Sequence, residues 1–381
     1  RLTGTLFYYN SFKLLPGIVH FYSALSGEKL HEENTFAQLQ WQQSSNDGRW
    51  RVRIQGKWNW FATHYRDELA VGNVHDADYN QREAYISGAV SYQPISQFFV
   101  GYAADYFFNN LSSSLSTDVR PYRNSLLQSL SVKYITSRFI AISRLLLSVY
   151  DNGACRGIAG RDAQRLSPSL SFSWKVFPIE QLYLRAAYKN IFRMPTFNEN
   201  YFYHFGSPSL DPESTQQYTL GLTWQHQFAH AWQALFTLDG YTNRITNQIV
   251  AVPYNMFVWT NINLGKVNSS GVELTTQQTF TITPRQQFLF YASYSFQHTV
   301  DCTDGTTDSY HKQLAYLPKH IASASVTWLN SLVNLSVSAV GMSKRWATHA
   351  HYGGTSLKSY GTIGLSAYRT FSLRNSSFMV R

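Results

Sequence analysis

Apolar and polar residues alternate one by one along most of this chain of 381 residues. Between positions 49 and 60, the even positions are mostly apolar, whereas the odd positions carry Arg, Gln, Lys and Asn. The same alternation runs through 216–225, 232–239 and 287–297. A period of two is typical of β-strands that bury one face and expose the other. We count about sixteen such strands of roughly 9–13 residues and a truncated one, so the pattern predicts an all-β fold.

The segments that join these strands alternate between short and long. Short turns are predicted at 44–48, 94–96, 136–138, 177–180, 227–231, 281–285 and 330–332. Long loops are predicted at 61–83, 107–122, 151–164, 190–212, 244–270, 298–317 and 344–357. Soluble strands average only ~5–6 residues. Long strands with turns of unequal length therefore indicate a transmembrane antiparallel β-barrel, with its apolar face toward lipid, its polar face toward the lumen and its short turns in the periplasm.

The composition agrees with this fold and excludes several classes of protein. Charged residues make up 14% of the chain, against roughly 25% in an average soluble domain, and aromatic residues make up 16%. This balance excludes a disordered chain. The net charge of +10 is spread over mostly single Lys and Arg residues, which argues against nucleic acid as a partner. Trp and Tyr residues near the predicted strand ends fit membrane-interface girdles, namely Trp58, Trp60, Tyr92, Tyr102, Tyr134, Trp174, Trp224 and Trp328.

Two ordered motifs lie in the predicted loops and the strands that follow them. The first comprises Phe192, Arg193, Pro195, Phe197 and Glu199, then Leu210, Pro212 and Glu213. The second comprises Asn263, Gly265, Gly271 and Glu273. Both resemble the barrel signature of TonB-dependent outer-membrane receptors. The resemblance is greatest to the shorter receptors for vitamin B12 or ferric siderophores of Bacteroidota-type bacteria.

The resemblance implies a barrel of about 22 strands that is filled by an N-terminal plug. About 16–17 strands are counted here, so residues 1–381 are expected to be a fragment of the barrel domain that lacks the plug and the terminal strands. The resemblance also implies location in the outer membrane of a Gram-negative bacterium. The implied function is TonB-energised import of a scarce ligand such as cobalamin or a ferric siderophore. The implied partners are membrane lipid, lipopolysaccharide, TonB through segments missing here, the chelate or corrinoid ligand, and a surface lipoprotein, with no cofactor.

Two other functions stay open from the sequence. A passive porin of 16–18 strands would hold a water channel and fits the strand count but not the motifs. A soluble or surface β-protein that binds glycans would fit the alternation alone. An enzyme is not predicted, because the sequence contains no Gly-x-Ser-x-Gly elbow, no phosphate-cradling glycine loop and no His-Glu-x-x-His.

Candidate ligand-binding residues are aromatic and histidine residues of the predicted external loops. They are Tyr201, Phe202, Tyr203, His204, Tyr254, Trp259, His351 and Tyr352. Such rings could grip a corrin ring or a catecholate, or simply pack against neighbouring loops. Among the motif residues, Arg193 and Glu213 are expected to form either an inward charge pair that shapes the barrel wall or a solvated pair, and Glu273 has the same two interpretations.

Histidine and cysteine residues of the loops give weaker signals. His349 and His351 could ligate a metal, but a His-x-His pair alone is weak evidence, so no metal site is predicted. Cys155 and Cys302 could form a disulfide in an oxidising compartment, provided that the fold brings them together.

Overall fold

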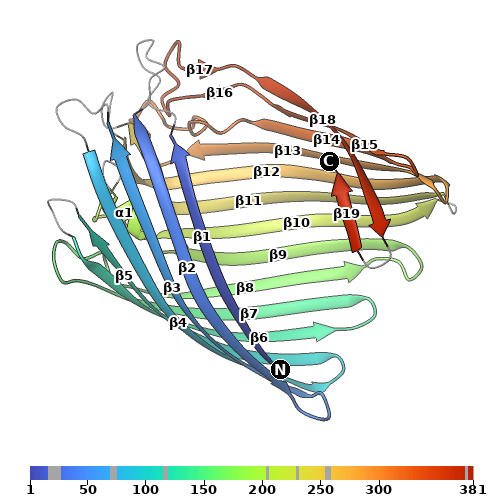
Figure 1. The fold of residues 1–381 in the computed structure, drawn as a ribbon, viewed down its shortest axis with the longest axis horizontal. Coiled ribbons are helices and arrows are strands. Elements are labelled where there is room, and N and C mark those ends of the chain that lie inside the picture. The colour runs from blue at the N-terminus through green and yellow to red at the C-terminus, as the bar shows by residue number, and fades with distance from the viewer. Residues whose placement is uncertain are drawn as a thin grey trace.

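The computed structural model describes residues 1–15, 27–68, 75–114, 119–202, 206–228, 231–253, 259–373 and 376–380. These residues form one antiparallel sheet of 17 strands, a separate two-stranded sheet and one short helix (Figure 1). The predicted all-β fold and the predicted number of long strands are thereby confirmed.

The elements follow one another as a meander with a single helical interruption. The large sheet contains β1 (Leu2–Leu14), β2 (Glu28–Ser44), β3 (Trp50–Asp67), β4 (His75–Ile95), β5 (Phe98–Ser113), β6 (Pro121–Ile135), β7 (Phe139–Ala154), β8 (Ala163–Lys175), β9 (Gln181–Arg193), β10 (Glu213–Phe228), β11 (Trp232–Pro253), β12 (Trp259–Thr283), β13 (Gln286–Asp301), β14 (His320–Leu329), β15 (Asn334–Met342), β18 (Tyr360–Leu373) and β19 (Ser376–Val380). The small sheet contains β16 (Arg345–Trp346) and β17 (Ser356–Leu357), and the helix is α1 (Phe197–Tyr201). In the described part of the chain, no helix is long and apolar enough to cross a membrane.

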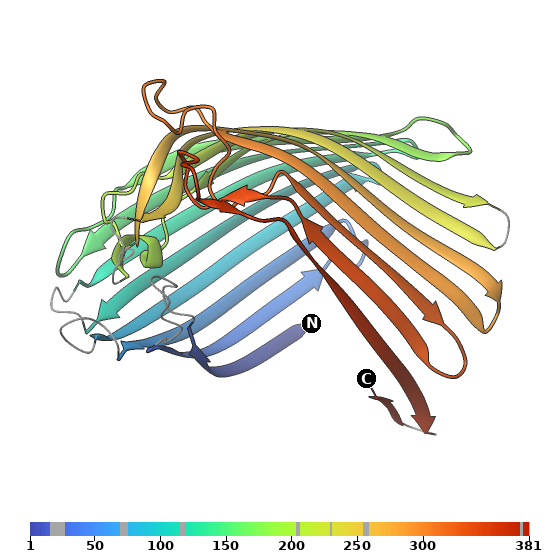
Figure 2. The same cartoon turned by 90° about the horizontal axis from the view of Figure 1, so that it is seen from above.

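Each strand of the large sheet pairs with its neighbour along the chain. Antiparallel pairing runs in order from β1 to β15, then from β15 to β18 and from β18 to β19. Among the described residues, no such pairing joins β1 to β19. The sheet therefore curls into a trough that is open between these two strands (Figure 2).

Strand β10 shows how the two faces of the sheet differ. Its outward residues Tyr218, Leu220 and Leu222 have exposed fractions of 43%, 60% and 41%. The intervening residues Thr219 and Gly221 lie on the inner face. Large apolar side chains exposed along one face are what a lipid-facing surface requires, because acyl chains rather than water then cover them.

Aromatic side chains form a stacked belt near the short turns. The rings of Phe228 and Trp232 stack with centroids 4.1 Å apart, and Trp232 stacks on Phe280 at 5.5 Å. Phe288 and Trp328 stack at 6.0 Å on the next pair of strands. Rings at this level fit the boundary between lipid and water on the short-turn side.

Several strands continue well beyond the predicted ends. The long loops predicted at 61–83 and 244–270 were wrong, because β3 reaches Asp67 and β4 starts at His75, while β11 and β12 run for 22 and 25 residues. Above the bilayer, water can solvate both faces of a strand while the backbone ladder stays intact. The alternation of apolar and polar residues detects only the part of a strand that contacts lipid.

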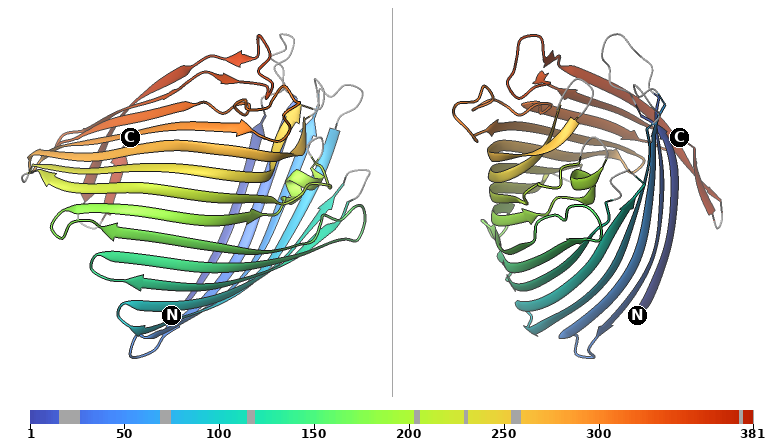
Figure 3. Two further views of the ribbon diagram at one scale, coloured as in Figure 1. Left: turned by 180° about the vertical axis from the view of Figure 1, so that it is seen from behind. Right: turned by 90° about the vertical axis from the view of Figure 1, so that its left-hand side faces the viewer.

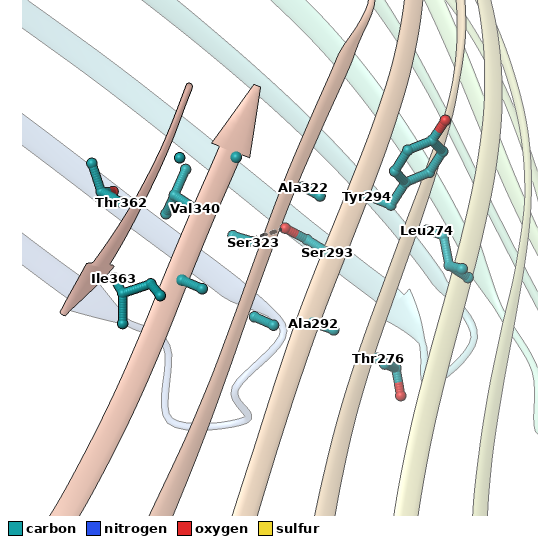
Figure 4. Close-up of a pocket in the computed structure, with 14 residues that line it drawn as sticks. Leu274, Thr276, Ala292, Ser293, Tyr294, Ala322, Ser323, Val340, Thr362 and Ile363 are labelled. Atoms are coloured by element: carbon teal, nitrogen blue, oxygen red, sulfur yellow. Dashed lines mark hydrogen bonds between the residues drawn. The ribbon is translucent and has the colours of Figure 1, made fainter. Parts of the chain in front are cut away.

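A shallow groove of about 650 Å³ lies on the outward face of β12–β15 and β18 (Figure 4). Small side chains such as Ala292 and Ala322 form its floor, and the larger Leu274, Tyr294 and Ile363 stand around it. The groove is a product of small residues on the apolar face. The loop site described next lies on the opposite, inner face of the sheet.

Candidate functional site

The loop between β9 and β10, described at residues 194–202 and 206–212 and called loop 194–212, folds inward and carries α1 into the curve of the sheet (Figure 3). A capping box starts this one-turn helix. The Thr196 hydroxyl accepts a hydrogen bond from the Glu199 amide at 3.2 Å, and the Glu199 carboxylate accepts one from the Thr196 amide at 2.8 Å. Both orphan amides at the start of the turn are thereby satisfied.

Arg193 ties the two ends of this loop together. Its Nε donates to Glu213 Oε2 at 2.6 Å, and its Nη1 donates to both Glu199 oxygens at 3.0 and 2.8 Å. Arg193 and Glu213 are also register partners at the adjoining ends of β9 and β10. Burial opposes ionisation of Glu199, but hydrogen bonds from Arg193 and Thr196 outweigh it and lower the pKa of that carboxyl. We name Arg193, Glu199 and Glu213 the charge clasp.

The inner tip of the loop packs against the wall formed by β4–β6. Phe202 stacks on Tyr79 with ring centroids 4.0 Å apart, and the Arg123 guanidinium lies 5.3 Å from the centre of the Phe197 ring. The buried side chains of this apolar cluster are Ala77, Tyr79, Leu111, Phe197 and Tyr201. The loop that leaves β9 therefore reaches strands that lie several positions away across the sheet.

Polar contacts secure the same crossing. Gln81 Nε2 donates to Asn198 Oδ1 at 3.0 Å, and the Tyr201 hydroxyl donates to the Ile158 carbonyl at 3.1 Å. An ion pair joins Arg161 to Asp211 farther along the loop. Contacts with β4 and with the loop after β7 thus hold one side of the helix-bearing loop.

The opposite side of the loop is held by β12. Asn263 Nδ2 donates to the Asp211 carbonyl at 2.9 Å, and Asn263 Oδ1 accepts from the Asp211 amide at 2.8 Å. Asn261 Nδ2 donates to the Glu199 carbonyl at 3.2 Å. Because Asn263 belongs to the second sequence motif and its partner Asp211 lies between Leu210 and Pro212 of the first, the two motifs meet in one site.

Two positions of this region require glycine, because other atoms come close to the backbone there. A Cβ on Gly206 would lie 2.7 Å from the Asn200 carbonyl oxygen and 2.8 Å from that of Phe202, and both are backbone atoms. A Cβ on the motif residue Gly271 would lie 2.6 Å from the Tyr241 ring, which covers it from the neighbouring strand. Any other residue would force the backbone or ring to move.

An ion pair lies on the inner face of β9–β11. Arg185 on β9 reaches across Gly221 on β10 to Asp239 on β11, with Nη2 at 2.9 and 3.0 Å from the two carboxylate oxygens. Glu273 on β12 is the register partner of Asp239 and lies on the same face. The polar face that the alternation predicts therefore carries charges of both signs.

Comparison with known proteins identifies this architecture. The family model described as TonB dependent receptor-like, beta-barrel, matches residues 147–377. The chain belongs to this family. Receptors of this family are outer-membrane barrels and not enzymes, so the predicted family and location are confirmed.

Individual relatives of the receptor are more distant. The chain is 27% identical to the vitamin B12 transporter BtuB of Photobacterium profundum over 155 residues. This match covers 39% of this chain and 23% of the relative. The unliganded ferric citrate transporter FecA matches with a TM-score of 0.76 and 15% identity, covering 98% of this chain and 60% of that structure. The copper transporter OprC gives a TM-score of 0.74 and 14% identity over 93% and 60%. The chain thus spans about 60% of these solved structures, and identities this low establish the fold alone.

The predicted ligand-binding residues of the receptor have different surroundings. Tyr201 is 8% exposed and packs in the apolar cluster, and Phe202 stacks on Tyr79. Trp259 is the first residue of β12, and its backbone pairs with Pro253. The remaining three candidates of this group lie outside the described residues, namely Tyr203, His204 and Tyr254.

The other two candidates lie in the loop after β15. His351 Nε2 is 2.7 Å from the Gln313 carbonyl oxygen, and its ring stacks on Trp346 at 4.6 Å. Tyr352 is 58% exposed and is the accessible ring of the pair. Cys155 and Cys302 are both free thiols. Within the described ranges, no group of three or more His, Cys, Asp or Glu residues could hold a metal ion.

Sequence reasoning missed the residues of the opposite wall. Tyr79, Gln81 and Arg123 lie on inward-facing positions of β4 and β6, so alternation places them in the lumen but cannot show that loop 194–212 reaches them. The helix itself had a readable signal, because Thr196 followed three residues later by Glu199 is a capping-box pattern.

Proposed function

We propose that residues 1–381 are the larger part of the barrel of a receptor that imports a scarce ligand across the outer membrane with energy from TonB. The observation that carries this proposal is the inward-folded loop 194–212, fixed by the charge clasp within a barrel of this family. The plug and the segment that contacts TonB would belong to the whole protein.

We further propose that the ligand is a corrinoid or a ferric chelate. The named relatives support this class, since one is a vitamin B12 transporter and another a ferric citrate transporter. Of the candidate residues whose side chains are described, Tyr352 has the accessible ring that stacking on such a ligand needs. Lipid and lipopolysaccharide would cover the apolar outward face, and a surface lipoprotein would be a further partner.

Loop 194–212 would act as a fixed part of the ligand's path. It extends from β12 to the wall of β4–β6, so a bulky ligand that enters the lumen must pass beside it. The charge clasp would hold this loop in one position, so that it neither blocks the opening of the barrel nor moves away from it. The ligand would therefore bind a preformed surface, and little of its binding free energy would be lost in ordering the loop.

Uptake by cells tests the transport proposal. A strain that lacks the receptor gene would be complemented with the whole receptor and supplied with radiolabelled cyanocobalamin or ferric siderophores, with and without TonB. We expect saturable uptake of one ligand class that disappears without TonB. Uptake of neither class would contradict the proposed ligand, and equal uptake without TonB would contradict the energised mechanism.

A passive porin is the second candidate, because 17 strands fall within the range of porin barrels. The family match does not favour it. Conductance across planar bilayers separates the two functions. A steady open channel formed by the whole protein would support the porin and contradict a plugged receptor.

A further inference from the structure

Two neighbouring loops at the same end of the barrel as loop 194–212 are docked on each other. Loop A, residues 302–319, joins β13 to β14, and loop B, residues 343–359, joins β15 to β18 and contains the β16–β17 hairpin. Loop A is anchored to the end of β13. Gln313, which is 5% exposed, accepts a hydrogen bond from the Thr299 amide at 3.0 Å, and the Leu314 amide donates to the Thr299 carbonyl at 2.9 Å.

Loop B rests on loop A through hydrogen bonds, and among the described residues no ion pair joins the two loops. The Tyr316 amide donates to the Trp346 carbonyl at 2.6 Å, and Lys312 Nζ donates to the Ala350 carbonyl at 2.8 Å. The Tyr352 hydroxyl donates to Asp308 Oδ2 at 3.4 Å, and two histidines of loop B make further contacts. The Ala315 amide donates to His349 Nδ1 at 3.2 Å, and His351 Nε2 lies 2.7 Å from the Gln313 carbonyl oxygen.

The two histidines have opposite roles in these bonds. His349 accepts at Nδ1, so that nitrogen must carry a lone pair and no proton. His351 faces a carbonyl oxygen and must donate, which its Nε2 can do in the neutral and in the protonated ring alike. Protonation therefore turns the His349 contact into donor against donor but leaves the His351 contact intact.

The surroundings of His349 favour its neutral form. Burial lowers the pKa of His349, against the attraction of Asp301 at the end of β13 and together with the repulsion of His351. Burial also lowers the pKa of His351, against its hydrogen bond to the Gln313 carbonyl oxygen and together with the repulsion of Lys312 and Lys319 of loop A. Because the docked ring has a lower pKa than a free ring, the undocked state binds the proton more readily. Docking of loop B is strongest at pH values above 6.5, which is the ordinary pKa of histidine, and it weakens as the pH falls below that value.

We propose that His349 is an acid-sensitive latch, whose protonation at Nδ1 releases loop B from loop A. Release would change the exposure of Tyr352 and so the loop surface offered to a ligand. Only this consequence rests on the proposed import function. The latch is a property of the two loops, and it can fail or hold independently of the ligand.

Hydrogen exchange of the full-length receptor in detergent tests the latch directly. The peptide that contains the Ala315 and Tyr316 amides is followed between pH 8 and pH 5, with rates corrected for intrinsic exchange. One linked proton can change the docking equilibrium by at most about tenfold per pH unit. We expect protection to be constant at the alkaline end and to fall by up to that factor per unit below pH 6.5.

Two matched variants locate the response. His349→Asn keeps an acceptor near the Nδ1 position without a titrating group, so it should dock at pH 8 and lose the larger part of the pH step, leaving only the contribution of His351. His351→Gln keeps a donor near Nε2 and should retain the step. A pH-independent wild type, or a step of wild-type size in His349→Asn, would overturn the proposal.

A second measurement covers the case in which His349→Asn fails to dock at pH 8. NMR titration of the His349 ring in the wild-type receptor then decides. Titration below the ordinary value of 6.5 supports the latch, whereas titration at or above that value contradicts it.

Discussion

Loop 194–212 and the docked loops A and B lie at the same end of the barrel but are held by different interactions. The first is fixed by the charge clasp and by the apolar cluster around Phe197. Loop B is held on loop A mainly by hydrogen bonds of backbone and imidazole groups. Charge-assisted hydrogen bonds are roughly twice as strong as neutral ones. Loop 194–212 is therefore held rigidly against the barrel wall, whereas loop B can respond to its surroundings.

The largest expected effect comes from removing an apolar side chain that holds loop 194–212 against β4. Phe197→Ala should weaken the docking of loop 194–212 by about 3 kcal/mol, because the ring is 8% exposed and leaves a cavity between β4 and α1. Hydrogen exchange of residues 196–202 measures this loss. Ile158→Ala is the control, since that side chain is 69% exposed and only its carbonyl serves the loop. Equal effects of the two variants would contradict the packing described.

Removal of the clasp comes next. Arg193→Met leaves Glu199 and Glu213 facing each other without a cation. A fully buried broken pair costs about 3–5 kcal/mol, but Arg193 is 39% exposed, so we expect about 2 kcal/mol. The same exchange measurement applies, with high salt reducing the difference between wild type and variant. Lys29→Met, which breaks the pair between Lys29 on β2 and Glu68 just after β3, should leave loop 194–212 unchanged.

A loss of comparable size is expected from crowding the turn of the loop. Gly206→Ala would place a methyl group against the Asn200 and Phe202 carbonyls, and overpacking of this kind costs about 1–3 kcal/mol. Gly353→Ala in loop B is the matched control, because nothing lies within 4 Å of its added Cβ. Loss of protection in both loops would indicate a general effect of glycine replacement.

The subtlest contrast is the response to pH. The lowered pKa of Glu199 means that the clasp contributes fully above the ordinary value of 4.5 and is lost only as pH falls through the lower, folded value. The His349 contact weakens already below 6.5. At pH 5.5, loop B should therefore lose protection from hydrogen exchange while loop 194–212 keeps it. Parallel loss in both loops would remove the distinction between them.

The sequence predicted the lipid-contacting part of the fold well because lipid imposes a period of two. Leu220 and Leu222 point outward as the alternation requires, and Arg193 contacts Glu213 across the loop that their motif flanks. Alternation failed where β11 and β12 leave the bilayer, since water accepts either face of a strand. The contact between Gln81 and Asn198 joins residues 117 positions apart, and no local pattern encodes it.

The course of loop 194–212 across the trough has a consequence for assembly. Pairing of each strand with its neighbour in sequence can grow hairpin by hairpin, and such nearby contacts form without closing long stretches of chain. The loop is different, because α1 meets β4 only after the five intervening strands have bent the sheet far enough. A donor and an acceptor fluorophore placed on α1 and β4 would therefore report when the growing sheet reaches its final curvature.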